Sequence, residues 1–219
     1  MGQSGTFAAP GRLALIGAVL AMTAVIAASN VLVQYPVEAS IGVLSLADLL
    51  TWGAFTYPVA FLVTDLMNRS YGPGVARRVV YAGFATAVVL SIYLATPRIA
   101  IASGSAFLVG QLLDIGLFNR LRAMSWWRAP LIGSLLGSAT DTLVFFSLAF
   151  APVFAGLLGE ADGFAIEPAA FLGLAGFESA RWVSWAVADF SVKLFAALFL
   201  LAPYRIAMEW MRPMPAATA

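Results

Sequence analysis

The residues of this chain best suited to chemistry are four aspartates that lie inside apolar stretches: Asp65, Asp114, Asp141 and Asp189. An acidic side chain at the centre of a bilayer costs about 2.5–3.5 kcal/mol on insertion scales, so it usually faces a partner, a cavity or a ligand. The chain has no histidine and no cysteine, which excludes disulfides, thiolate metal sites and the usual proton shuttle. The pattern indicates a polar binding pathway inside a membrane protein, with no metal or other cofactor expected.

The composition fits a polytopic membrane protein. Of the 219 residues, 62% are hydrophobic and 11% are charged, whereas soluble domains average roughly 45–50% apolar and about 25% charged residues. The mean hydropathy is +0.92. A net charge of only +1 gives no reason to expect a nucleic-acid partner.

Six apolar stretches are long enough to cross a hydrocarbon core, which takes about 20 helical residues. We predict an all-α bundle of six transmembrane helices forming a single domain over residues 1–219, with a polar cytoplasmic tail (1–12) and an external loop (153–180). The first apolar stretch lacks a small-residue cleavage site, so we expect a retained helix and not a signal peptide. The predicted spans are residues 13–34, 49–66, 79–96, 99–118, 130–152 and 182–203.

The charges agree with six spans, because Lys and Arg near helix ends gather on the cytoplasmic side. Nine basic residues fall on one side of the bundle, which predicts that both termini are cytoplasmic. A seventh span within 151–180 would place the last two of them outside. The nine are Arg12, Arg69, Arg77, Arg78, Arg120, Arg122, Arg128, Arg205 and Arg212; six acidic residues fall on the other side, with Arg98 and Arg181.

The kinked second span is the first candidate for recognition. Pro58 removes a backbone donor and frees a carbonyl about one turn earlier, beside aromatic rings and hydroxyls. Such a segment suits a planar ligand that forms hydrogen bonds, although a kinked helix with interfacial aromatics explains it equally well. The candidate binding residues here and at the outer end of the first span are Asn30, Gln34, Trp52, Thr56 and Tyr57.

The fourth span adds Arg98 at its outer end and Gln111 near the cytoplasmic end. Asp65 and Asp114 lie within about a turn of the arginine-rich surface, where we expect ion pairs that fix helix ends or form a cytoplasmic gate. Other members of this predicted gate are Arg77, Arg78 and Asn119. Small residues along the same span would let helices pack closely, and they allow a homodimer without requiring one.

The remaining two aspartates lie in the fifth and sixth spans. Asp189 and Lys193 are four residues apart on one helical face, in the favourable order for an ion pair. Asp141 has no cation on its own helix, so it must pair with another helix, bind a proton, or wait for a ligand donor. We therefore expect Asp141 to meet the ligand, with Asp189 as the second candidate.

Several segments closely resemble the queuosine precursor transporter family, which is vitamin-uptake-transporter-like and distantly similar to the substrate-binding subunits of energy-coupling-factor importers. The resemblance runs in order from about residue 29 to 146, and more loosely through VADFSVKL to the C-terminus. The long loop before the sixth span diverges from the family. The matching segments are SNVLVQYPV, TWGAFTYPVAFLVTDL, RIAIAS, GQLLDIGLFNRLR, WWRAP and SATDTLVFF.

The resemblance implies import of 7-deazaguanine precursors of queuosine, such as preQ0 and preQ1, through a multi-pass protein of the bacterial inner membrane. A stand-alone carrier is the preferred mechanism. A subunit of an energy-coupling-factor importer is the alternative, and it would need a separate ATPase because this chain has no phosphate-binding loop. An intramembrane aspartyl protease would use two facing carboxylates, but no GxGD motif surrounds Asp141 or Asp189. A purely structural helix bundle, with the aspartates holding helices together, is the remaining alternative.

Overall fold

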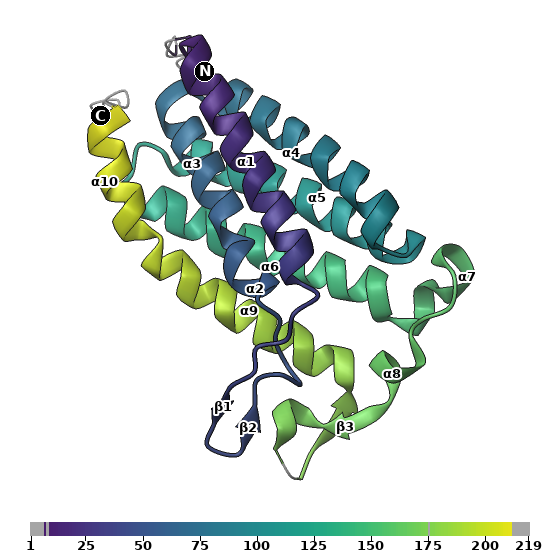
Figure 1. Ribbon diagram of the computed structural model, residues 1–219. Coiled ribbons are helices and arrows are strands. Elements are labelled where there is room, and N and C mark those ends of the chain that lie inside the picture. Colours follow the sequence, from purple (N-terminus) through teal and green to yellow (C-terminus); the bar gives the residue numbers. More distant parts are fainter. Residues whose placement is uncertain (1–6, 8, 175, 212–219) are drawn as a thin grey trace.

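The computed structural model is a bundle of long helices with short hairpins at one end (Figure 1). It describes residues 7, 9–174 and 176–211. Arg212 and part of the tail 1–12 therefore lie outside the described residues. Five helices are long and apolar enough to cross a membrane: α1 (Arg12–Leu32), α4 (Pro73–Leu94), α5 (Pro97–Leu121), α6 (Arg128–Phe150) and α9 (Arg181–Phe199).

The second predicted span is a broken helix and does not begin at residue 49. It consists of α2 (Gly53–Thr56) and α3 (Pro58–Tyr71), and Tyr57 between them keeps helical backbone angles. The residues before it form a small hairpin, β1 (Ser40–Ile41) with β2 (Leu44–Ser45), followed by turns. Gly53 sits where the chain returns to α1, and a Cβ there would lie 3.0 Å from the backbone of Val33. A glycine is thus required for this close approach.

Proline and glycine set the boundaries of several helices. Pro58, Pro73 and Pro97 each occupy the first turn of a helix, where the missing N–H is not needed and the fixed φ angle favours helix. Gly72 has φ +84° and turns the chain from α3 into α4, a conformation that other residues rarely adopt. The hydroxyl of Thr96 accepts a hydrogen bond from the backbone N–H of Ile99 and caps α5.

Small residues allow α5 and α6 to pack closely. A Cβ on Gly137 would lie 3.0 Å from the carbonyl oxygen of Gly110 and 2.7 Å from the ring of Phe61. Apolar side chains of α1, α3, α4 and α5 pack together in the largest core cluster, in which Met22, Val79 and Val80 are almost completely buried. In lipid, such close packing is the main force that holds helices together.

The segment between α6 and α9 contains only short elements. They are η1 (Pro152–Phe154), α7 (Ala155–Leu158), α8 (Gly163–Ile166), β3 (Pro168–Ala170), η2 (Phe171–Gly173) and β4 (Glu178–Ala180), with β3 and β4 paired antiparallel. The described part of this segment has no helix of spanning length. It lies with the β1–β2 hairpin at one end of the bundle. The N- and C-terminal ends lie at the opposite end, where α10 (Leu201–Met211) continues α9 (Figure 1).

Candidate functional site

A large cavity lies at the end of the bundle opposite the chain termini. Its volume is about 1000 Å³, at the upper end of the roughly 300–1,000 Å³ of typical ligand sites. The helix ends that surround it include the last turns of α1, α4 and α6 and the first turns of α5 and α9. The β1–β2 region, α8 and β3 also contribute to its wall. The bundle thus forms a chamber that is partly covered by short loop elements.

A cluster of three charged side chains from two helices lies at the wall of this cavity. The Nζ atom of Lys193 lies 2.6 Å from Oδ2 of Asp189 and 2.7 Å from Oδ2 of Asp141. The hydroxyl of Thr142 lies 3.1 Å from the same ammonium and donates to Asp189 at 2.8 Å. Lys193 and Asp141 are only 5% exposed at their side chains. A buried charge is expensive unless it is paired, so these contacts make the cluster tolerable in the bundle.

The cluster resolves the alternatives left open for Asp141. Its cation comes from another helix, because α9 packs against α6 and places Lys193 between the two carboxylates. The expectation that Lys193 neutralises Asp189 alone is therefore incomplete, since one lysine faces both acids. Sequence spacing reveals the pair within α9, but it cannot reveal a partner on a different helix.

Aromatic side chains form much of the remaining wall. Phe150 contacts the ring of Trp185 edge to face, with centroids 5.5 Å apart, and Phe146 lies 5.9 Å from Phe150. Tyr57 also lines the cavity, and its ring centroid lies 5.5 Å from the ammonium of Lys193. A planar ligand in this cavity would meet both ring faces and charged hydrogen-bonding groups.

Several predicted binding residues do line this cavity: Asn30, Gln34, Tyr57, Asp141 and Asp189. The side-chain amide of Asn30 donates to the carbonyl of Ile26 at 2.9 Å, and that of Gln34 donates to the carbonyl of Asn30 at 3.3 Å. Their side-chain oxygens accept no hydrogen bond from the described residues. These two amides therefore offer acceptors at the cavity wall.

Four other predicted binding residues do not line the cavity. Arg98 is buried and donates to the backbone carbonyls of Leu148, Ala151 and Gly159, so it fixes the end of α6. Gln111 is fully buried between helices and accepts a 2.6 Å hydrogen bond from Thr64.

Trp52 and Thr56 are the other two. Trp52 is half exposed and packs against Phe55. The hydroxyls of Thr56 and Ser29 bond each other at 2.9 Å, which ties α2 to α1. Neither residue lines the cavity, although their neighbours Gly53 and Ala54 do.

The predicted ion pairs at the arginine-rich end are not present. Within residues 7, 9–174 and 176–211, neither Asp65 nor Asp114 has a basic nitrogen within 4.0 Å. The side chains of Arg77, Arg78 and Asn119 are exposed. The reason is geometric: the two aspartates face the interior between α3, α5 and α6, while those three residues lie on the outer surface.

Two arginines at this end bond backbone carbonyls. Arg69 donates to the carbonyl of Arg122 at 2.9 Å, and Arg122 in turn donates to the carbonyl of Asn68. Burial, and secondarily the charge of Arg69, lowers the pKa of Arg122 to about 10. The guanidinium of Arg122 therefore stays charged at neutral pH, and the two residues hold the end of α3 against the end of α5.

Several residues of the cavity wall were not predicted from the sequence. Trp185, Phe145, Phe146 and Phe150 form the aromatic wall, and Ser184 also lines it. One signal was available for Trp185, because it precedes Asp189 by four residues and must share its helical face. The phenylalanines gave no such signal, since an apolar run in a membrane helix usually faces lipid or core.

Long apolar helices around a large cavity that contains a buried ion cluster define a multi-pass membrane protein with room for a small molecule. The model of the putative vitamin uptake transporter family matches residues 51–96 and 90–207, and the chain belongs to this family. It is 34% identical over 206 residues to the probable queuosine precursor transporter of Haemophilus influenzae, covering 82% of this chain and 79% of that one.

Other relatives agree with this assignment. The chain is 33% identical over 207 residues to the queuosine precursor transporter of Escherichia coli, covering 84% of this chain and 82% of that one. The probable queuosine precursor transporter of Bacillus subtilis is 26% identical over 132 residues, 48% of this chain and 58% of that one. No solved structure matches the chain. The comparisons confirm the resemblance inferred from the motifs.

Proposed function

We propose that this protein imports queuosine precursors of the 7-deazaguanine class, such as preQ0 and preQ1, into the cytoplasm across a bacterial inner membrane. The names of the relatives support the substrate class. The observation that carries the proposal for this chain is the aromatic-walled cavity with the Asp141–Lys193–Asp189 cluster at its wall. A transporter of a planar, polar heterocycle needs both surfaces in one site.

Asp141 is the proposed acceptor for the substrate. A deazaguanine has a guanine-like edge with adjacent N–H donors, which a carboxylate can accept. Lys193 bonds one oxygen of each carboxylate, Oδ2 of Asp141 and Oδ2 of Asp189, and Thr142 also donates to Asp189. A carboxylate has about four acceptor sites on its two oxygens. Asp141 therefore keeps acceptor sites for a ligand beside Lys193.

Other cavity groups complete the recognition. The heterocycle can stack on Trp185 or Tyr57, a contact that is attractive beyond simple burial. Lys193 already serves three acceptors, so it holds the carboxylates in place rather than reading the substrate. The amide of Asn30 or Gln34 is the better group to read the substrate's carbonyl and ring nitrogens.

The charge distribution supports import as the direction of transport. The basic helix ends lie at the same end of the bundle as the chain termini, which the positive-inside rule places in the cytoplasm. The cavity lies at the other end and so would face the outside. A stand-alone carrier would bind the substrate there and release it inward after a rocking motion of the helices.

Purified protein in proteoliposomes, without any ATPase, tests this proposal. Labelled preQ0 should exchange across the membrane when unlabelled preQ0 is present inside, whereas absence of exchange by properly folded protein would reject a stand-alone carrier of this substrate. Asp141→Asn should weaken apparent affinity about 10- to 150-fold, because hydrogen bonds to charged groups contribute about 1.5–3 kcal/mol. Glu38→Gln removes an exposed acid and should change nothing. Unchanged affinity in Asp141→Asn would refute carboxylate recognition while leaving transport intact.

A further inference from the structure

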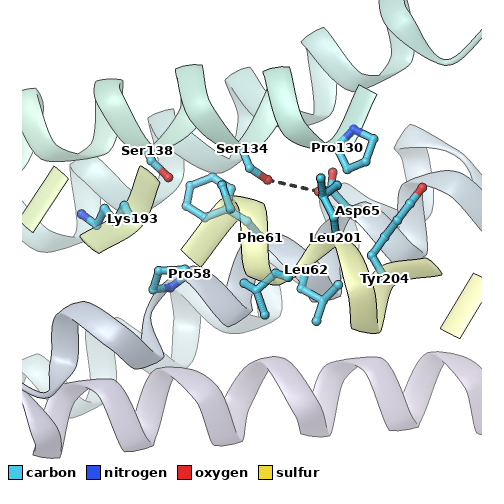
Figure 2. Close-up of a pocket in the computed structure, with 12 residues that line it drawn as sticks. Pro58, Phe61, Leu62, Asp65, Pro130, Ser134, Ser138, Lys193, Leu201 and Tyr204 are labelled. Carbon is cyan, nitrogen blue, oxygen red and sulfur yellow. Dashed lines mark hydrogen bonds between the residues drawn. The ribbon is translucent and has the colours of Figure 1, made fainter. Parts of the chain in front are cut away.

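A second, smaller cavity lies on the terminal side of the ion cluster. Its volume is about 20 Å³, enough for one water molecule, which needs about 10–15 Å³. Asp65, Ser134, Ser138, Lys193 and Tyr204 supply its polar lining (Figure 2). Lys193 lines both cavities. The small cavity therefore continues the polar pathway from the substrate site toward the end of the bundle that carries the termini.

A pair of buried carboxyl groups lies beyond this small cavity. Asp65 is 2% exposed and Asp114 is 0% exposed, and both carboxyl groups lie against the same turn of α6, Asp65 at Ser134 and Asp114 at the adjacent Gly133. Oδ2 of Asp65 accepts from Ser134 at 3.2 Å. The other three carboxyl oxygens have no hydrogen-bond partner in the described part of the chain. The hydroxyl of Tyr204, also buried and without a partner there, lines the same cavity.

The surroundings of this pair do not neutralise two negative charges. Arg69 is one turn along α3 and attracts charge on Asp65, but it makes no contact within 4.0 Å and donates to the carbonyl of Arg122 instead. The ammonium of Lys193, at the far side of the small cavity, is held by Asp141 and Asp189. Two adjacent carboxylates without a cation cannot both stay charged in a buried site, so they share at least one proton.

The lining between the two clusters can conduct a proton. Ser134 and Ser138 are four residues apart on α6 and therefore share a face. Figure 2 shows both serines between Lys193 at one end and Asp65 at the other. Hydroxyl groups and a water molecule both donate and accept hydrogen bonds, which makes them suitable relays. The small cavity thus places hydroxyl groups between the substrate site and the carboxyl pair.

We propose that the Asp65–Asp114 carboxyl pair is the proton-binding site of a proton-coupled importer, which moves one proton inward with each substrate molecule. The inference rests on the proposed function, since it names the energy source for that transport. The pair already shares one proton, so binding of a second proton makes it neutral and lets the loaded protein reorient. Release of the proton at the arginine-rich end then accompanies release of the substrate. Only a proton changes place, and no covalent bond is made or broken.

Proteoliposomes with the membrane potential held at zero by valinomycin and equal potassium test the coupling. When the pH is lower outside the vesicles than inside, the vesicles should accumulate labelled preQ0. The expected ratio is about tenfold per pH unit if one proton accompanies each substrate, because one pH unit and a tenfold concentration ratio are equivalent in free energy. A dye inside the vesicles should report acidification on addition of preQ0. Exchange of labelled for unlabelled preQ0 without either effect would overturn the coupling and leave the proposed function intact. Absence of exchange would reject the proposed function itself.

Variants then test the assignment to this pair. Asp65→Asn with Asp114→Asn should still exchange preQ0 but should lose both accumulation and acidification, while Glu38→Gln should keep all three. Normal gradient-driven accumulation by the double variant would overturn the assignment. If the double variant fails to fold, the two single variants replace it. Loss of acidification in both single variants, with exchange of preQ0 retained, would support the assignment of the proton site to this pair. Accumulation driven by a sodium gradient and insensitive to pH would also overturn the inference.

Discussion

Replacing Lys193 by methionine should destabilise the protein far more than removing any exposed cation. The change keeps most of the side-chain volume but leaves Asp141 and Asp189 without the ammonium that lies 2.7 and 2.6 Å from them. Breaking a buried pair by removing one partner typically costs about 3–5 kcal/mol, because the remaining charge is uncompensated. Two carboxylates share this cation, so we expect a loss at the upper end of that range.

The same chain offers a matched control. Arg205 and Glu209 form an ion pair with an N–O distance of 3.1 Å, but their side chains are 47% and 63% exposed, against 5% for both Lys193 and Asp141. An exposed pair of this spacing contributes about 0.3–0.5 kcal/mol. Arg205→Met should therefore cost several kcal/mol less than Lys193→Met, although the contact distances are similar.

Reversible unfolding in mixed detergent micelles, or thermal unfolding at neutral pH, measures both variants. Adding Asp141→Asn and Asp189→Asn to Lys193→Met should recover part of the lost stability, because the uncompensated charges disappear. Equal stability of Lys193→Met and Arg205→Met would refute the buried cluster. Failure of the two asparagines to restore any stability would show that packing, and not charge, explains the loss.

Three further changes test other parts of the structure. Gly137→Ala should destabilise the protein by about 1–3 kcal/mol through overpacking. Gly116→Ala should be neutral or stabilising, because a Cβ there would have no other atom within 4 Å. Unfolding in micelles compares the two variants. Arg98→Met should shift thermal unfolding downward by removing three hydrogen bonds to backbone carbonyls at the end of α6 and in the loop that follows it; an unchanged midpoint would contradict its anchoring role. Trp185→Ala should weaken preQ0 affinity in exchange assays by about 1–2 kcal/mol, whereas Trp210→Ala, a strongly exposed residue, should not.

The long helices could be predicted from the sequence because a membrane imposes one requirement, an apolar run of about 20 residues. Five predicted spans correspond to helices of spanning length. The predicted start of the second span was wrong, since the residues before Gly53 form a hairpin and turns. Strands of two residues carry no periodicity to detect, and Gly42, with φ +61°, marks their turn only once the pairing is known.

The site could be predicted only where its residues share a helix. Asp189 and Lys193 are four residues apart, so their contact follows from helix geometry. The contact of Lys193 with Asp141 depends on how α9 packs against α6, which no local pattern specifies. The prediction that Arg98 binds the ligand was wrong for a related reason. A charged residue near a helix end can donate hydrogen bonds to a ligand or to neighbouring carbonyls, and only the packing of α5 against α6 determines which of the two it meets.

The four aspartates divide into two pairs with opposite electrostatic designs. Asp141 and Asp189 share a cation at 2.7 and 2.6 Å, so both can remain charged beside an incoming ligand. Asp65 and Asp114 share no cation among the described residues, and in the proposed cycle a proton supplies the missing positive charge. A fixed ammonium is always present, whereas a proton can arrive and leave. This difference suits the first pair to recognition and the second to driving a cycle, and Lys193, which lines both cavities, is the residue through which one pair would sense the other.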